Sequence, residues 1–386
     1  MEDRFIPLSV PNLSGNEKQY VSHAVDIGWV STGGQYVTDF ENSVASYLKT
    51  PGAVACQSGT AALHISLLLS GVTDADMVIV PTLTFIAAVN PVRYIGAEPV
   101  FMDCDEQLCI DPVKVERYCA EECHMEGERL IDNRTGKHVK ALVIVHVFGN
   151  MAQMEPLLDI ASKYHLRVVE DATEAIGTHY TAGRYAGKFA GTMGELGALS
   201  FNGNKIITTG GGGMILSNSE ETLKHAKHLT TQAKADVVYF EHDEIGFNYR
   251  LTNLQAALGL AQMEQLDGFI ASKKANYRRY LDAIDGIPGL HMLGFREGTD
   301  SNHWFYSVYC EDAYPLDRDQ LIKKFDGAHI QTRPVWGLIH QQKPYAPFRS
   351  YQVERAVDFR RHIVNIPCST DLTCGDIDRV VACLKY

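Results

Sequence analysis

Residues 141–177 read ALVIVHVFGNMAQMEPLLDIASKYHLRVVEDATEAIG: an apolar run, a stretch with helical spacing, and a second apolar run. Both apolar runs are continuous rather than alternating, which is typical of strands buried on both faces of a sheet. Similar runs recur from Ala53 to Ser217, including AVAC, MVIVP, PVFMDC, GALSFN and GGMILS, with helical segments such as TAALHISLLLSG between most of them. This alternation predicts an α/β fold, a three-layer α/β/α domain with a mainly parallel sheet, in which ligands bind at the carboxyl ends of the strands.

The pattern changes after about Asp243. A long helical segment over residues 253–284 ends at glycine and proline stop signals. Beyond it, SNHWFYSVYC resembles a strand and PLDRDQLIKKFD a helix. We expect a large domain over residues 1–245 and a smaller α+β C-terminal domain over residues 246–386.

The charge balance limits the partners of the chain. It carries 35 basic and 47 acidic residues, a net charge of −12, and no basic run that could follow a phosphate backbone. No apolar stretch reaches membrane-spanning length, and the start MEDRFIPLSV lacks the pattern of a secretory signal. We therefore expect no nucleic acid and no membrane as partner, and a cytoplasmic location.

The cysteines favour a reduced compartment, because there are nine of them, an odd number spread along the chain. Cys119, Cys123 and His124 lie close together, but no second pair completes a tetrahedral metal site. We interpret them as ordinary helix residues and predict no metal.

Three positions at strand ends could carry chemistry. In SGTAAL, Gly59 and Thr60 begin a helix, where backbone amides favour a phosphate; a plain helix cap without a ligand is the commoner use of such residues. Asp171 ends the strand-like LRVVED and could cap a turn or hold the proton of a pyridine nitrogen.

The third position is Lys205, in SFNGNKIITTGGGGM. A lysine in a glycine-rich loop is ordinarily a surface charge, but lysine also forms the Schiff base with an aldehyde cofactor. Together, the possible phosphate cradle, acid and amine indicate pyridoxal phosphate. No GxGxxG follows a strand, and the glycine run lacks the lysine of a P-loop, so dinucleotide binding and phosphoryl transfer are disfavoured.

Other features receive a structural interpretation. We expect Gly210 to Gly213 to let the backbone turn tightly beside the cofactor, and His64 and His146 to be hydrogen-bonded core residues. Two tryptophans, Trp304 and Trp336, could line a substrate site or fill the smaller domain, and we favour the second interpretation.

The blocks SGTAAL, TFIAAVNPV, VVEDATEAIG, SFNGNKIITTGGGGM, GFNYRLTNLQAALG and QTRPVWGLIH, in this order, resemble the sugar-nucleotide aminotransferases of pyridoxal phosphate fold type I, the DegT-type family. The resemblance covers nearly the whole chain. It implies an aspartate aminotransferase-like fold with a seven-stranded sheet, pyridoxal 5'-phosphate as cofactor, L-glutamate as donor with 2-oxoglutarate as its product, a nucleotide-linked keto sugar as acceptor, and a homodimer with shared active sites.

The resemblance also implies residue roles. Lys205 would bind the cofactor aldehyde and, once freed, move the proton, while Asp171 would pair with the pyridine nitrogen. The other implied cofactor-binding residues are Gly59, Thr60 and Ser200 at the phosphate, Phe85 and Thr173 on the two ring faces, Glu174 at the ring hydroxyl, Asn202, and Asn248 reaching the phosphate in the neighbouring subunit. For the sugar nucleotide the resemblance suggests Arg250, Arg333 and His340, although a structural ion pair is an equally common use of arginine.

Two departures from the family pattern bear on the acceptor. Asn202 and Gly211 stand where many members carry histidine and glutamate. The sequence of this loop is similar to that of the family branch that makes the amino sugars of bacillosamine or legionaminic acid biosynthesis. We therefore expect UDP-4-keto-6-deoxy-N-acetylglucosamine as acceptor and a 4-amino-4,6-dideoxy sugar for a surface glycan as product. The alternatives are a GDP- or dTDP-linked keto sugar, as in perosamine or C3-amino sugars, and a cofactor-binding regulatory protein without turnover. Members with histidine in place of Lys205 are dehydratases, so its presence favours amino transfer.

Overall fold

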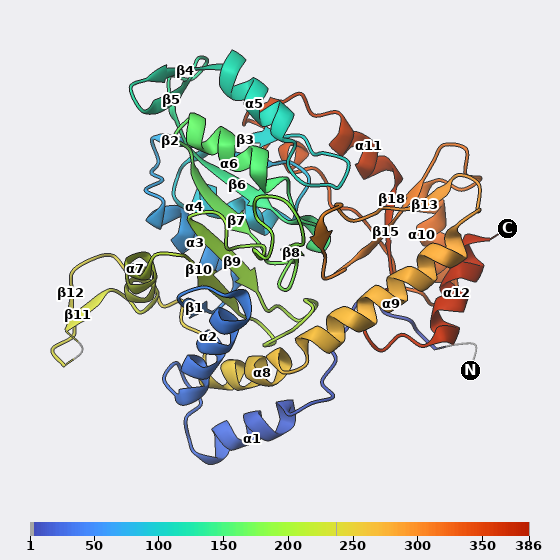
Figure 1. Cartoon of the computed structure of the whole chain (residues 1–386), viewed down its shortest axis with the longest axis horizontal. Helices are drawn as coiled ribbons and strands as arrows, with labels where there is room; N and C mark the ends of the chain where they lie inside the picture. The colour runs from blue at the N-terminus through green and yellow to red at the C-terminus, as the bar shows by residue number, and fades with distance from the viewer. Residues whose placement is uncertain (1–3, 237, 386) are drawn as a thin grey trace.

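The computed structural model describes residues 4–236 and 238–385. Among these residues a ten-stranded sheet forms the centre, with strands side by side in the order β1-β10-β9-β7-β6-β2-β3-β17 (Figure 1). The strands before β17 in this order are β1 (Ala53–Cys56), β2 (Asp76–Pro81), β3 (Glu98–Met102), β6 (His138–Val145), β7 (Arg167–Asp171), β9 (Leu196–Ser200) and β10 (Gly213–Leu216). Only β10 runs antiparallel to its neighbours in this series. This confirms the predicted mainly parallel sheet, and β17, β4 and β5 extend it beyond the seven strands that were expected.

Burial on both faces explains why these strands are continuous apolar runs. Every residue of β2 is buried, and helices lie on both sides of the sheet (Figure 1). Helix α3 (Gly59–Leu69) packs across β7, β9 and β10. Helix α6 (Met154–Lys163) packs on β7 and also contacts α5 (Pro112–Glu121). Helices α2 (Gln35–Leu48) and α7 (Glu220–Thr230) contact the edge strand β1.

The smaller α+β part contains a four-stranded antiparallel sheet in the order β13-β15-β18-β16. Its strands are β13 (Leu290–Met292), β15 (Tyr306–Cys310), β16 (Arg333–Pro334) and β18 (Ile363–Ile366), and its helices are α10 (Arg318–Gly327), α11 (Arg355–His362) and α12 (Cys374–Leu384). Capping boxes begin α10 at Asp317 and α12 at Thr373, because each side chain accepts a backbone N–H of the first turn.

The prediction of one helix over residues 253–284 was wrong in one respect. The chain forms two helices, α8 (Asn253–Met263) and α9 (Leu266–Ile284), which change direction between residues 263 and 266 (Figure 1). Helix α8 packs against α1 (Glu17–Asp26) and α2, whereas α9 reaches β13 and α12 of the smaller part. The side-chain amides of Gln262 and Gln265, on either side of the break, both donate to Glu17.

The division at residue 245 stays a prediction, since segments from each side cross it. Ile6 forms a parallel bridge with Ile330, and Leu8 O accepts the Cys368 N–H, so the start of the chain lies on the smaller part. In the other direction, β17 (Ser350–Tyr351) pairs with β3 of the large sheet.

The polar segment after α5 is a surface hairpin, β4 (Cys123–Glu126) and β5 (Arg129–Asp132), which joins the edge of β6. Cys119 is a helix residue as expected, but Cys123 and His124 begin a strand, so that part of the prediction was wrong. The remaining elements are η1 (Ile86–Ala88), α4 (Asn90–Tyr94), η2 (Val147–Gly149), β8 (His179–Tyr180), β11 (Lys234–Asp236), β12 (Glu241–His242), β14 (Thr299–Asp300) and η3 (Ile339–Gln341). Within the described residues, none of the helices combines the length and apolar character of a membrane span.

Candidate active site

A cavity of about 370 Å³ lies at the carboxyl ends of β7 and β9 and at the start of α3. This is where a doubly wound sheet is expected to bind its ligand, and the volume suits a small molecule. Nine residues predicted from the sequence line it: Gly59, Thr60, Phe85, Asp171, Thr173, Glu174, Ser200, Asn202 and Lys205.

Asp171 is the last residue of β7, and its carboxylate is buried in the floor of the cavity. The backbone N–H of Thr173 donates to its Oδ1 at 3.0 Å, so the expected turn cap is present. Burial raises the pKa of Asp171 above its ordinary value. A buried carboxylate in the lining of such a cavity is suited to stabilise a protonated ring nitrogen, which fits pyridoxal phosphate.

Lys205 follows β9 in the loop that lines the other side of the cavity. Its Nζ lies 3.4 Å from Glu174 Oε1 and 4.1 Å from the centroid of the Trp304 ring. Burial raises the pKa of Glu174, and the backbone N–H of Phe148 donates to its Oε2 at 2.8 Å. The amine is therefore held inside the cavity, between an acid and an aromatic face, and is not the surface charge that a glycine-rich loop ordinarily carries.

Two glycines let the backbone close around a small polar cradle. A Cβ on Gly59 would lie 2.8 Å from Ser200 Cβ and 3.0 Å from Thr173 Cγ2, and one on Gly213 would lie 2.3 Å from Ser58 O. The Ser58 hydroxyl caps α3 by accepting the N–H of Ala61. The first amides of α3 and the side chains beside them form a site that fits the phosphate of the cofactor.

The glycine run has more than one use. Gly210 has a φ of +78° and makes the turn, whereas Gly213 permits the close approach of β10 to the start of α3. The backbone therefore turns at Gly210, while the position of the run beside a cofactor stays a prediction.

Four predicted residues lie outside the lining of this cavity: Asn248, Arg250, Arg333 and His340. The Arg250 guanidinium donates to Asn248 Oδ1 at 3.3 Å, and its backbone bridges Cys56 at the end of β1. Arg333 is exposed on β16. His340 Nδ1 is 2.6 Å from Thr82 Oγ1, and burial lowers its pKa. The structure does not bring these residues together with Lys205 within one chain.

Three aromatic side chains, Trp304, Phe305 and Trp336, line the cavity, and sequence reasoning did not predict Phe305. Trp304 is also buried in the core, so the preferred interpretation of the tryptophans as packing residues was incomplete. Phe148 lies behind them, with its ring centroid 4.6 Å from that of Trp336 and 5.5 Å from that of Phe305. Its φ of +56° is unusual for a bulky residue, and this conformation aims its N–H at Glu174. No local pattern signals these roles, since they depend on contacts between distant segments.

The interpretation of His64 and His146 as hydrogen-bonded core residues is confirmed. His64 Nδ1 lies 3.2 Å from the Tyr249 hydroxyl, and His146 Nε2 lies 2.8 Å from Glu170 Oε2. Both rings are buried.

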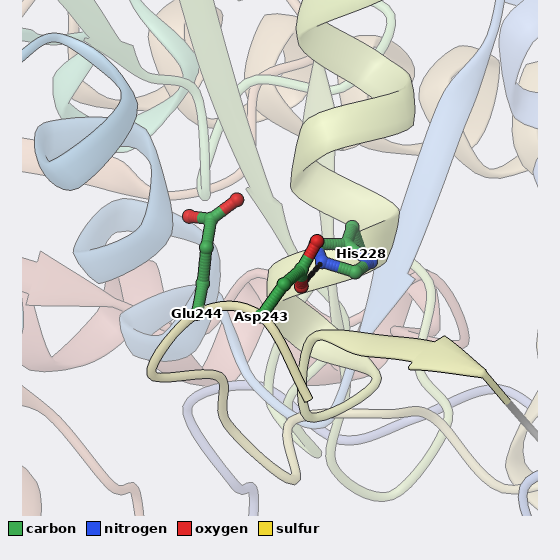
Figure 2. A group of neighbouring side chains, drawn as sticks. All are labelled: His228, Asp243 and Glu244. Carbon is green, nitrogen blue, oxygen red and sulfur yellow. Dashed lines mark hydrogen bonds and ion pairs between the residues drawn. The ribbon is translucent and has the colours of Figure 1, made fainter. Parts of the chain in front are cut away.

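A second group of potential ligands lies outside the cavity, where ligand atoms of His228, Asp243 and Glu244 are within 4.8 Å of one another. Figure 2 shows His228 of α7 against Asp243, with Glu244 beside the pair. His228 Nε2 is 2.6 Å from Asp243 Oδ1, and Glu244 binds His225 at 3.0 Å. These contacts attach the segment after β12 to α7, and the predicted lack of a metal stays a prediction.

The chain is similar to known proteins along almost its whole length. The model of the DegT/DnrJ/EryC1/StrS aminotransferase family matches residues 11–385. The chain is 36% identical over 382 residues to GDP-perosamine synthase of Caulobacter vibrioides, covering 98% of this chain and 97% of that protein. It is 34% identical over 386 residues to EpsN of Bacillus subtilis, covering 99% of this chain and 95% of that protein. The crystal structure of DesV from S. venezuelae is similar with a TM-score of 0.83 at 27% identity, covering 96% of this chain and 93% of that chain.

Proposed function

Because the chain belongs to the DegT/DnrJ/EryC1/StrS aminotransferase family and is a pyridoxal phosphate-dependent sugar aminotransferase, we propose that it moves the amino group of L-glutamate to C4 of a nucleotide-linked 4-keto-6-deoxy sugar. The observation that carries the proposal is the meeting of the Lys205 amine, the buried Asp171 carboxylate and the glycine-lined cradle in one cavity. When bound, the cofactor supplies an aldehyde for the amine and a ring that accepts electron pairs.

In this proposal each residue has a distinct task. Lys205 would hold the cofactor through its aldehyde and, when free, would move the proton at the reacting carbon; its Nζ lies 3.4 Å from Glu174 Oε1. Asp171 keeps the ring nitrogen protonated. The cradle of Gly59, Thr60 and Ser200 binds the phosphate, and the remaining cavity residues orient the ring: Phe85, Thr173 and Asn202.

The acceptor that we favour is a GDP-linked 4-keto-6-deoxymannose. The UDP-linked N-acetyl sugar was the first expectation from the sequence, but the relative from Caulobacter vibrioides is named for a GDP-linked amino sugar. The product would then be a 4-amino-4,6-dideoxy sugar for glycan biosynthesis. The UDP- and dTDP-linked sugars, and amination at C3, become outcomes of the test.

We further propose a homodimer in the cytoplasm. The arm that carries β11 and β12 projects from the body (Figure 1), and Val238, Tyr239, Phe240 and Ile245 on it are exposed. A patch of large apolar side chains favours contact with a second copy. Asn248 follows this arm and does not line the cavity of its own chain, which supports its proposed contact with the cofactor phosphate of the neighbouring subunit. Free cysteines throughout the described residues agree with a reduced compartment.

A single-turnover experiment tests the function. The purified protein is loaded with L-glutamate, freed of excess donor and mixed separately with GDP-, UDP- and dTDP-linked 4-keto-6-deoxy sugars while the cofactor absorbance is followed. We expect glutamate to convert the spectrum and the GDP-linked sugar to restore it, with the amine at C4 by NMR of the product. Lys205→Ala should abolish both changes, while Lys188→Ala, at an exposed lysine, should behave as wild type.

The outcomes separate the alternatives. Restoration by the UDP-linked sugar alone would overturn the acceptor and leave the reaction standing. No response to glutamate would contradict amino transfer from this donor and favour the regulatory alternative.

A further inference from the structure

Trp304 holds two neighbouring parts of the Lys205 loop. The face of its indole lies 4.1 Å from Lys205 Nζ, and its Nε1–H donates to the carbonyl oxygen of Asn204 at 2.9 Å. The first contact stabilises a cation through the ring electrons, and the second fixes the backbone just before the lysine. A buried aliphatic residue of similar volume would provide neither contact.

Trp304 is itself fixed in place. It is only 2% exposed, and its ring stacks on Phe305 with centroids 4.0 Å apart. Its carbonyl oxygen accepts a hydrogen bond from Lys273 Nζ at 3.1 Å, and that lysine is also buried. Since stacking and hydrogen bonds restrain both ring and backbone, the indole presents a rigid surface to Lys205.

Asn302 ties this tryptophan to the acid on the other side of the lysine. Its Oδ1 accepts the backbone N–H of Trp304 at 2.9 Å, and its Nδ2 donates to the carbonyl oxygens of Glu174 and Ile176, each at 3.0 Å. The spacing between the indole face and the Glu174 segment is therefore set by a buried amide. Lys205 Nζ lies in the space between them.

From this geometry we propose that Trp304 is a positioning residue for the reaction: it holds the Lys205 amine beside Glu174, where the amine, once freed, would take the proton from the substrate carbon and deliver it to the carbon of the cofactor aldehyde. The proposal rests on the proposed role of Lys205, and it does not depend on which sugar is the acceptor. The opposing interpretation is that Trp304 only fills space between the two parts of the chain. That interpretation predicts losses of stability but not of amine placement.

The first test reads the amine without the cofactor. Cofactor-free wild type, Trp304→Leu and Trp304→Phe are treated briefly with an amine-acylating reagent, and labelling of Lys205 relative to the exposed Lys188 is quantified by peptide mass spectrometry. We expect labelling of Lys205 to rise several-fold in Trp304→Leu and less in Trp304→Phe, which keeps a ring face but loses the N–H. Phe359→Leu, at a buried ring outside the cavity, is the control. An unchanged ratio in both Trp304 variants would overturn the proposal.

The second test reads the proton transfer in the loaded enzyme. In the glutamate half-reaction we expect Trp304→Leu to be about 10- to 100-fold slower, because misplacing a reacting group has costs of this order. The apparent Kd for glutamate should stay within about threefold, and the deuterium isotope effect with α-deuterated glutamate should increase. Weaker glutamate binding in Trp304→Leu with an unchanged isotope effect would show a structural role only. An equal decrease of the half-reaction rate in Phe359→Leu would show the same.

The variants also keep the proposal testable when one of them does not fold. Should Trp304→Leu fail to fold, Trp304→Phe decides, with an expected slowing of about threefold or more and a raised isotope effect. Complete inactivity of Lys205→Ala supports the role on which the proposal rests, whereas an active Lys205→Ala would overturn that role and this inference together. A wild-type response in Trp304→Phe with an inactive Lys205→Ala would overturn this inference alone.

Discussion

Glu170→Gln should destabilise the protein strongly, although it exchanges groups of nearly equal size. Glu170 is the residue before Asp171 in β7 and is 0% exposed. Its carboxylate accepts four hydrogen bonds. The donors are His146 Nε2 and the Gly191 N–H, each at 2.8 Å from Oε2, and the N–H groups of Met193, at 2.6 Å from Oε1, and of Gly194.

The magnitude follows from the geometry of these bonds. A glutamine keeps one oxygen, so whichever way the amide is turned, its NH₂ group faces two of the four donors. Each buried donor that loses its acceptor costs about 1–3 kcal/mol, which gives a loss of about 2–6 kcal/mol. His146 cannot relieve the conflict by changing tautomer, because its Nδ1 already accepts the Ala152 N–H at 3.2 Å.

The assay is urea unfolding of the cofactor-free wild type and variant at pH 7, followed by circular dichroism. We expect the free energy of unfolding to fall by about 2–6 kcal/mol in Glu170→Gln. Glu128→Gln, at an exposed position of the β4–β5 hairpin, should change it by less than about 0.5 kcal/mol. A loss below about 1 kcal/mol in Glu170→Gln would refute the reasoning, since each unpaired donor alone should cost that much.

Two further predictions concern the cradle and the acid. Gly213→Ala places a methyl group 2.3 Å from Ser58 O and 2.6 Å from Gly59 N, so it should displace the start of α3 and weaken cofactor binding about tenfold or more. Spectroscopic titration with the cofactor measures this loss. The control Gly203→Ala, whose new Cβ would meet nothing within 4 Å, should bind the cofactor as wild type does. Burial raises the folded-state pKa of Asp171, so the folded protein binds more protons than the unfolded chain, and wild-type stability should fall as pH rises from about 4 toward that raised value. In Asp171→Asn this pH-dependent loss of stability should be absent, and the glutamate half-reaction should be lost. Urea unfolding of both proteins between pH 4 and 7 measures the free energy of unfolding. An equal decrease with pH in wild type and variant would contradict the prediction.

Much of the fold was predictable because its signals are local. The apolar runs that became β6 and β7 are continuous since both faces of each strand are covered, and strand-helix alternation limits the topology to a mainly parallel sheet. Lys205 and Asp171 were predictable for a related reason. Each follows or ends a buried strand, and the carboxyl ends of parallel strands meet at one edge.

The rest of the site depends on contacts that no local pattern records. Trp304 donates a hydrogen bond to Asn204, 100 positions earlier in the sequence. The segment SNHWFYSVYC that contains Trp304 could equally have been a strand with this side chain in the core. The conformation of Phe148, with its φ of +56°, is imposed by its surroundings and not by residue preference. The break between α8 and α9 is a third example, because the segment has helical spacing throughout and only tertiary packing turns it.

Glu170 and Asp171 show how the fold supports an unfavourable site. They are neighbours in one strand, so their side chains point to opposite faces of the sheet. Glu170 accepts four donors and stabilises the loop that contains residues 191–194, whereas Asp171 is buried with hydrogen bonds from Thr173, and burial still raises its pKa. The hydrogen bonds of Glu170 therefore offset, in the same strand, the free energy that burial of the Asp171 carboxylate costs. Since the strand is fixed from its far face, the Asp171 side chain stays directed at the cavity. A protonated ring nitrogen there would supply the positive charge that stabilises the Asp171 carboxylate.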